Sequence, residues 1–171
     1  EIKINAPNGD IYLANGYRLP TEAEAEYMQR AGGKSNGDFH FDGSGELLSD
    51  YGWYSKRRTY PVGELKPTIV DGNKFYDLLG NVWEWTTDPQ GHSRYGGTNP
   101  RSLDRVGAHI IRGGGWSSDS RSLRSYERTS NPSGRPLSDI GFRLVRTTGP
   151  SPGYYRHIEF LIGAFRRWMF R

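Results

Sequence analysis

The sequence contains no cysteine among its 171 residues. This absence excludes disulfide bonds, thiolate metal sites and cysteine nucleophiles. The sequence also lacks any run approaching the ~20 apolar residues that a membrane-spanning helix needs. Its charge is only mildly biased, with 23 basic against 19 acidic side chains and a net charge of +4. Such a surplus modestly favours anionic partners and does not indicate a specific nucleic-acid binder.

Histidine and serine form no recognisable catalytic pattern. The four histidines are far apart in the sequence, which disfavours a zinc or iron site; they are His40, His92, His109 and His157. No Gly-x-Ser-x-Gly sequence marks a serine nucleophile, and residues 38–42 (Asp-Phe-His-Phe-Asp) are interpreted as a solvated hairpin. The glycine run 113–115 ends at Trp116 without a helix signal, so it predicts close backbone packing rather than a phosphate cradle. We therefore expect no catalytic residue.

The composition is that of a globular protein whose core depends on aromatic residues, with 34% apolar residues, 13% aromatic residues and 23 glycines. The length suits one domain. Thr21 followed by Glu24 is a capping-box pattern, which predicts a helix that ends at Gly32-Gly33. Weak alternation over residues 2–13 predicts a short hairpin, and residues 33–75 predict long loops with brief strands.

Four short motifs follow one another in order: Arg18-Leu-Pro-Thr-Glu-Ala-Glu24, Gly80-Asn-Val-Trp-Glu-Trp85, Arg112-Gly-Gly-Gly-Trp116 and Gly141-Phe-Arg-Leu-Val-Arg146. As a set, spanning about three quarters of the chain, they resemble the formylglycine-generating enzyme (sulfatase-modifying factor) family. This resemblance implies an α+β, C-type-lectin-like fold that is irregular and loop-rich, with short antiparallel strands and few helices. We expect this domain to span residues 1–149. The family usually has tryptophan in the place of Ala25, so we expect the helix to pack differently here.

The same resemblance bears on catalysis. In the family's oxidase, two copper-binding cysteines follow the third motif; the first falls near Ser118, and the second falls in a stretch that this chain shortens. Both are missing, so we expect neither a copper cofactor nor that oxidase activity. The alternative is an enzyme of the same superfamily that works without cysteine, such as an iron-dependent oxidase that takes its metal ligands from a second domain.

The second motif offers a candidate metal site. Asn81 and Glu84 supply the oxygen ligands that calcium accepts, and the resembled family carries calcium near this motif. The alternative, which we favour, is structural: Asn81 caps a turn, Glu84 satisfies buried amides, and Trp83 and Trp85 fill the core. No other cofactor is expected. Four arginines could together recognise an anion: Arg112, Arg124, Arg128 and Arg143. The alternative, which we favour, is that Arg143 and Arg128 are structural and pin loops by pairing with acids or carbonyls.

The interval between the third and fourth motifs is rich in short polar residues, especially over residues 117–139. It resembles the variable region of diversity-generating retroelement proteins, several of which use the same lectin-like fold. Their mutagenesis replaces adenines and does not yield Lys, Gln, Met, Trp or Glu. Between Ser117 and Asp139, Glu127 is the only residue of a type that this mutagenesis does not yield. This pattern predicts a diversified, non-catalytic binding surface on a rigid scaffold.

The resemblance to variable proteins implies a receptor-recognition role on a virion or at an extracellular or cell surface. We expect a protein or glycan ligand on a target cell surface, with avidity raised by display in many copies. The positions predicted to face the ligand are Ser117, Ser118, Asp119, Ser120, Ser122, Tyr126, Ser130 and Asn131.

The segment 150–171 is predicted to be a C-terminal amphipathic extension. Apolar residues recur at helical spacing from Ile158 to Met169 with arginines between them, which predicts a helix. The glycines and prolines of residues 149–153 are expected to separate it from the domain. Such a helix can dock on the domain, form a homo-oligomer or lie on an anionic membrane. We favour docking or self-association over membrane contact.

Overall fold

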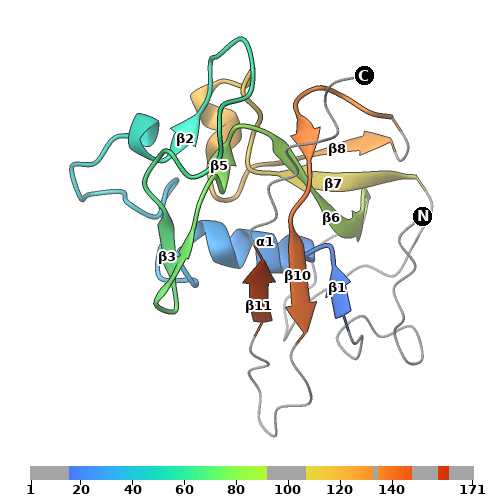
Figure 1. Ribbon diagram of the computed structural model, residues 1–171, viewed down its shortest axis with the longest axis horizontal. Helices are drawn as coiled ribbons and strands as arrows, with labels where there is room; N and C mark the ends of the chain where they lie inside the picture. Colours follow the sequence, from blue (N-terminus) through green and yellow to red (C-terminus); the bar gives the residue numbers. More distant parts are fainter. Residues whose placement is uncertain (1–15, 92–106, 133–134, 148–157, 162–171) are drawn as a thin grey trace, which may run out of the picture.

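The structure is a computed structural model, and it describes residues 16–91, 107–132, 135–147 and 158–161 (Figure 1). It consists mostly of short strands and loops around one α-helix. No helix in these described ranges is long and apolar enough to cross a membrane. The elements are β1 (Gly16–Arg18), α1 (Glu22–Gln29), η3 (Leu48–Asp50), β2 (Gly52–Trp53), β3 (Thr68–Val70), β4 (Asn73–Phe75), β5 (Leu79–Gly80), β6 (Trp83–Pro89), β7 (Ala108–Arg112), η4 (Ser120–Leu123), β8 (Arg128–Pro132), β9 (Ile140–Gly141), β10 (Leu144–Thr147) and β11 (Ile158–Leu161), where η marks a 3-10 helix.

The predicted capping box starts α1. The amide of Glu24 donates to the Thr21 hydroxyl at 3.1 Å, and the amide of Thr21 donates to the Glu24 carboxylate at 2.8 Å. That carboxylate also accepts hydrogen bonds from both terminal nitrogens of the buried Arg18, each at 2.7 Å. A second acid supports the same helix end, since Asp88 accepts from the amide of Glu22. The first motif thus fixes the helix start to β1 and β6 through buried polar contacts.

The strands form four small sheets. The largest has the order β8-β7-β6-β9, with β7 antiparallel to both neighbours and β9 parallel to β6. The second, β1-β10-β11, is antiparallel throughout. The remaining pairs are the parallel β2-β5 and the antiparallel hairpin β3-β4. In the view of Figure 1 the largest sheet lies above α1, and the β1-β10-β11 sheet lies below it.

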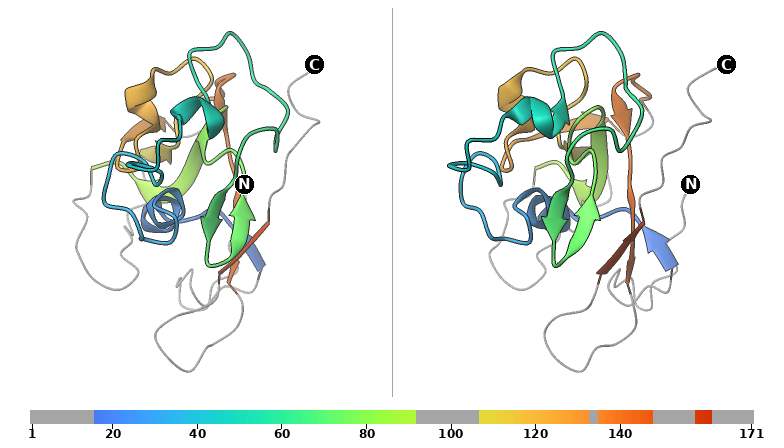
Figure 2. Two further views of the ribbon diagram at one scale, coloured as in Figure 1. Left: turned by 90° about the vertical axis from the view of Figure 1, so that its left-hand side faces the viewer. Right: turned by 60° about the vertical axis from the view of Figure 1, so that its left-hand side comes forward.

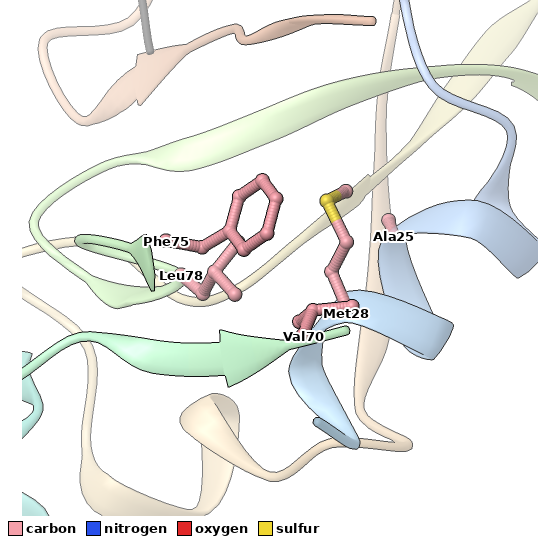
Figure 3. Close-up of a cluster of buried hydrophobic side chains, with 5 residues drawn as sticks. All are labelled: Ala25, Met28, Val70, Phe75 and Leu78. Atoms are coloured by element: carbon pink, nitrogen blue, oxygen red, sulfur yellow. The ribbon is translucent and has the colours of Figure 1, made fainter. Parts of the chain in front are cut away.

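Two apolar clusters make the core. In the first, α1 contributes Ala25 and Met28, which pack with Val70, Phe75 and Leu78 (Figure 3). The alanine that stands in the place of the family's usual tryptophan is therefore still a core residue. The second cluster lies under the loops around η3 and η4 and comprises Phe41, Tyr51, Leu79 and Leu123, with Phe39, Leu48 and Tyr54 against its edge. Long loops with brief strands over residues 33–75 are confirmed.

Residues 38–42 are not the solvated hairpin that the sequence suggested. The segment is a series of turns whose Phe41 is buried, with its ring stacked between those of Phe39 and Tyr51 at centroid separations of 5.3 and 4.5 Å. His40 packs edge-on against Phe41 and Tyr51. The segment turns inward because burial of these aromatic rings is favourable, while Asp42 stays exposed and Asp38 pairs with Arg124.

The helix predicted for the C-terminal extension is wrong over Ile158–Leu161. These residues form β11, which pairs antiparallel with β10 so that Leu144 faces Leu161 and Thr147 faces Ile158. Since β1 occupies only one edge of β10, its other edge has unpaired backbone groups that a strand satisfies and a helix does not. The remainder of the extension, the breaker at 149–153 and the hairpin predicted for residues 2–13 lie outside the described residues.

Candidate ligand-binding face

Two arginines at the ends of β7 and β8 connect the sheet to α1. Arg112, whose side chain is 1% exposed, contacts the carboxylates of Glu22 and Glu26. It also donates to the carbonyl oxygens of Ser125 at 2.9 Å and Glu127 at 3.3 Å. Arg128 donates to both oxygens of Glu22 at 2.9 and 3.0 Å. The chain on either side of Tyr126 is therefore held by a buried cation from the third motif.

Glycines in the second and third motifs pack against neighbouring segments that leave no room for a side chain. Gly80 has φ of +76°, and a Cβ there would overlap the Trp53 backbone. Gly114 has φ of +81°, and its Cβ would lie 2.5 Å from Leu123 Cδ1. A side chain at either site would strain the backbone and displace its neighbour. Close packing of the glycine run is thus confirmed.

The stretch 116–139 is tied together across its loop. Asp119 caps η4 by accepting from the amides of Arg121 and Ser122, at 3.0 and 3.1 Å. Hydrogen bonds from Ser122, first from its amide and then from its hydroxyl, lower the pKa of Asp119. Near the two ends, the Ser117 hydroxyl donates to Asp139 at 3.1 Å, and Trp116 Nε1 donates to the Ser138 carbonyl oxygen at 3.4 Å. Leu123, at 0% exposure, anchors the middle of the stretch in the core.

Most of the positions predicted to face a ligand lie at the surface of this stretch. Ser117, Asp119, Ser120 and Tyr126 are exposed, and Ser118, Ser122 and Ser130 are half-buried. The first six of the eight positions lie between Trp116 and Glu127, over η4, whereas Ser130 lies in β8. Figure 2 shows η4 at the end of the molecule opposite β1, β10 and β11.

Asn131 corrects the prediction, because it does not face the solvent. Its side chain is 6% exposed, and its amide donates to the carbonyl oxygens of Arg135 at 2.9 Å and Pro132 at 3.4 Å. It pairs with His109 in the register of β7 and β8. Asn131 therefore stabilises the turn that follows β8. A preference of short polar residues for turns, which the composition of the stretch already suggested, explains its presence there.

A loop that the sequence analysis did not select lies beside this stretch. The amide of Ser55 donates to the Ser118 carbonyl oxygen at 2.9 Å, and the amide of Lys56 donates to the Trp116 carbonyl oxygen at 2.7 Å. Three consecutive basic residues, Lys56, Arg57 and Arg58, are exposed on the loop. The sequence signal was a run of three cations between Trp53 and Tyr60. Their position next to residues 116–118 follows only from the fold.

The calcium candidates Asn81 and Glu84 have protein partners in this structure. Asn81 Oδ1 accepts from the amide of Tyr60 at 3.0 Å, and its Nδ2 donates to the Tyr60 carbonyl oxygen at 3.1 Å. Glu84 instead forms a two-point ion pair with Arg143. Within the described ranges, no three histidine or acidic side chains converge in a metal-binding group. The structural role that we favoured for Asn81 fits these contacts, whereas Glu84 binds a cation rather than backbone amides.

Two further expectations for this region have clear outcomes. Trp83 and Trp85 are half-buried and do not fill the core. The four arginines do not converge on one anion, because they bind acidic side chains of three different residues: Arg112 and Arg128 share Glu22, Arg124 binds Asp38, and Arg143 binds Glu84. The structural role that we favoured for Arg128 and Arg143, pairing with acids, is confirmed. Of the histidines, His40 lies in the aromatic cluster and His109 lies in β7, whereas His92 and His157 are outside the described residues.

Comparison with protein families identifies the architecture. The model of the sulfatase-modifying factor enzyme 1-like domain matches residues 4–148. The chain belongs to this family. Its fold is accordingly the α+β, C-type-lectin-like fold that the four motifs implied, with few helices and short strands in small sheets. The ion pairs and glycine contacts described above are this chain's means of building that domain.

Relatives within and beyond the family have varied names. The chain is 34% identical over 158 residues to the chaperone protein LppX of Paenibacillus barcinonensis, covering 78% of this chain and 50% of that protein. It is 30% identical over 157 residues to the bovine formylglycine-generating enzyme, covering 81% and 41%. Among solved structures, it is similar to Treponema denticola variable protein 1, with a TM-score of 0.66, 28% identity and coverage of 82% and 53%. The chain thus spans half or less of the curated relatives it matches.

Proposed function

We propose that this domain is a non-catalytic binding module. Its recognition surface, called the binding face below, is the exposed part of residues 117–139. The observation that carries the proposal is the division within that stretch. Leu123 and Ser125 are fully buried and the neighbouring carbonyl oxygens are held by Arg112, whereas Ser117, Asp119, Ser120 and Tyr126 are exposed. Side chains can therefore change at the surface while the backbone keeps its path.

The proposal extends to a variable protein of a diversity-generating retroelement. It is supported by the structural similarity to Treponema denticola variable protein 1 and by the residue types of the interval. Tyrosine provides contact area at low entropic cost, and short polar groups provide adaptable hydrogen bonds, as in antibody paratopes. The proposed partner is a protein or glycan on a target cell surface, bound from a virion or cell surface on which many copies raise the avidity.

Randomising the exposed positions tests the proposal directly. Ser117, Ser120 and Tyr126 are replaced together by mixtures of Ser, Asn, Asp, Tyr and Arg, while Asp119 is kept because it caps η4, and the library is displayed and selected against unrelated proteins. Most members should retain a Tm within about 5 °C of the parent, since surface changes cost about 0.5 kcal/mol or less each. The control library randomises the buried Leu123 and Ser125 and should mostly unfold. Equal stability of the two libraries, or no selectable binder in the first, would contradict the proposal.

The encoding DNA gives an independent test. A reverse transcriptase gene nearby, with a near-copy of the codons for residues 112–146 that differs only at adenines, is expected. Their absence would exclude the retroelement assignment while leaving a binding role open.

An enzymatic role is the competing proposal, and it is favoured by the relatives named formylglycine-generating enzyme. The absence of cysteine argues against their copper chemistry in this chain. Elemental analysis of purified protein separates the two roles. Stoichiometric iron or copper that tracks substrate turnover would support the enzyme, whereas calcium alone, or no metal, is expected for the binding module.

A further inference from the structure

We propose that residues 53–60, called the basic loop below, are a constant part of the binding face that receives a segment rich in aspartate and glutamate on a protein ligand. This inference rests on the proposed binding function and adds the chemical class of the ligand. The basic loop lies outside residues 117–139 and carries Lys56, Arg57 and Arg58 at its exposed tip. It would contribute the same positive charge whatever side chains the neighbouring stretch displays.

The basic loop is continuous with the binding face. Its Ser55 and Lys56 amides donate to the carbonyl oxygens of Ser118 and Trp116, at 2.9 and 2.7 Å. Figure 2 shows the loop that follows β2 and the η4 segment gathered at the same end of the molecule. A ligand seated on Ser117 and Asp119 would therefore also be within reach of cations from the basic loop.

The base of the loop is rigid. The rings of Trp53 and Tyr60 stack at a centroid separation of 4.2 Å and an interplanar angle of 11°. Asn81 fixes both ends, because its side chain bonds the amide and carbonyl of Tyr60 and its amide donates to the Trp53 carbonyl oxygen at 2.8 Å. Lys56 lies 5.8 Å from the Trp53 ring centre, and Arg58 lies 5.8 Å from that of Tyr60. Cations placed on such a frame lose little entropy when they bind.

Among the described residues, these cations form no salt bridge within the domain. Ion pairs of the described residues engage seven other basic residues, Arg18, Arg30, Lys66, Arg112, Arg124, Arg128 and Arg143. Lys56, Arg57 and Arg58 form no ion pair with a carboxylate in the described part of the chain. Asp119, which caps η4, already accepts hydrogen bonds from the main-chain amide of Arg121 and from the amide and hydroxyl of Ser122. The basic loop therefore presents unneutralised positive charge to a ligand.

The aromatic groups favour an acidic protein segment over a glycan or a nucleic acid. Nucleic-acid bases, like many sugar rings, bind by stacking on an open aromatic face. The Trp53 and Tyr60 rings stack on each other and carry cations, and Arg124 lies 6.0 Å from the ring centre of Tyr126. Carboxylates need no such platform, because guanidinium groups bind them through paired hydrogen bonds.

Fluorescence anisotropy with synthetic peptides tests the inference. The probes are a labelled peptide of alternating glutamate and serine and its glutamine–serine counterpart. The test variant is Arg57→Gln/Arg58→Gln. The control variant, Lys34→Gln/Lys74→Gln, removes the same charge from exposed sites after α1 and in β4. The acidic peptide should bind, the glutamine peptide should not, and the test variant should lose about tenfold in affinity against about twofold or less for the control. Binding should weaken between about 0.05 and 0.3 M salt.

Several results would overturn the inference: no binding of the acidic peptide, equal binding of both peptides, or equal losses in the two variants. Tighter binding of heparin that depends on Arg57 and Arg58 would assign the loop to a sulfated glycan instead. An Arg57→Glu variant, which should prefer a lysine–serine peptide, keeps the test valid if the double variant is unstable. Library binders that ignore the Arg57→Gln/Arg58→Gln change would contradict only the basic loop, whereas a library without binders contradicts the proposed function.

Discussion

Replacing Arg112 with methionine tests whether buried charge holds the binding face to the rest of the domain. The substitution keeps an unbranched side chain of similar length and removes the guanidinium. It removes one of the cations that contact Glu22, whose side chain is 7% exposed, while the partly exposed Arg128 still contacts that carboxylate. It also leaves the carbonyl oxygens of Ser125 and Glu127 without their donor.

The expected cost is large because one partner of a buried ion pair is removed while the other remains. Such changes destabilise proteins by about 3–5 kcal/mol. For a domain of this size, each kcal/mol shifts Tm by about 2–4 °C, so Arg112→Met should lower Tm by about 6–20 °C. The matched control is Arg124→Met, whose pair with Asp38 has side-chain exposures of 34% and 43%. Solvent screening limits that pair to about 1 kcal/mol or less.

The measurement is urea unfolding of Arg112→Met, of the control Arg124→Met, of Glu22→Leu and of the double variant Arg112→Met/Glu22→Leu. The double variant should be less destabilised than the sum of Arg112→Met and Glu22→Leu, since each single change leaves one charge of the Arg112–Glu22 pair without the other and the double change removes both. Hydrogen exchange at residues 125–128 should also quicken in Arg112→Met. A cost for Arg112→Met no larger than that of the Arg124 control, or strict additivity in the double variant, would refute the reasoning.

Two other predictions concern the core beneath the face. Burial lowers the pKa of His40, against the opposing charge of Glu46, so the unfolded chain binds this proton more readily. The free energy of unfolding should therefore fall as the pH drops below about 6.5 and level off below the pKa of His40 in the folded protein. The measurement is the urea midpoint as a function of pH, which should lose this dependence in the His40→Phe variant. Equal pH dependence in the parent and the variant would contradict the role of His40. Gly80→Ala should destabilise the domain by more than about 3 kcal/mol, because a Cβ would overlap Trp53. The control is Gly72→Ala, which has φ of +81° and open space around it and should cost only about 1 kcal/mol of backbone strain. Similar thermal midpoints for the two variants would show that the close approach at Gly80 is unimportant.

Local sequence signals predicted local structure well. The capping box needs only Thr21 and Glu24, three residues apart, and it is present with both hydrogen bonds. The sequence also predicted close backbone packing of the glycine run, and a Cβ at Gly114 would overlap Leu123, which lies nine residues further along the chain. Contacts of this range depend on the chain's own stereochemistry, so the pattern of residues identifies them.

Elements that depend on distant partners were predicted poorly. The apolar spacing of residues 158–169 fits a helix, but Ile158–Leu161 pair with β10, whose open edge is not visible in that segment's sequence. Asn131 has a residue type suited to a paratope, yet the register of β8 turns it inward. The basic loop was missed for the same reason, because the main-chain contacts of Ser55 and Lys56 with residues 116–118 span about 60 residues. Tertiary pairing in each case overrides what the local pattern favours.

The loss of the family's cysteines need not disturb the fold, and the contacts of Ser118 show why. Near the position of the first cysteine in the resembled oxidase, the Ser118 hydroxyl accepts from the amide of Gly115 at 3.0 Å, and its carbonyl accepts from Ser55. The loop is thus shaped by main-chain hydrogen bonds and by the packing of Gly114 on Leu123, neither of which requires a thiol. Because Arg18, Asn81, Arg112 and Arg143 are all engaged in buried or half-buried contacts, the motifs that identify the family maintain the scaffold, and the exposed side chains between the third and fourth motifs can change without disturbing it.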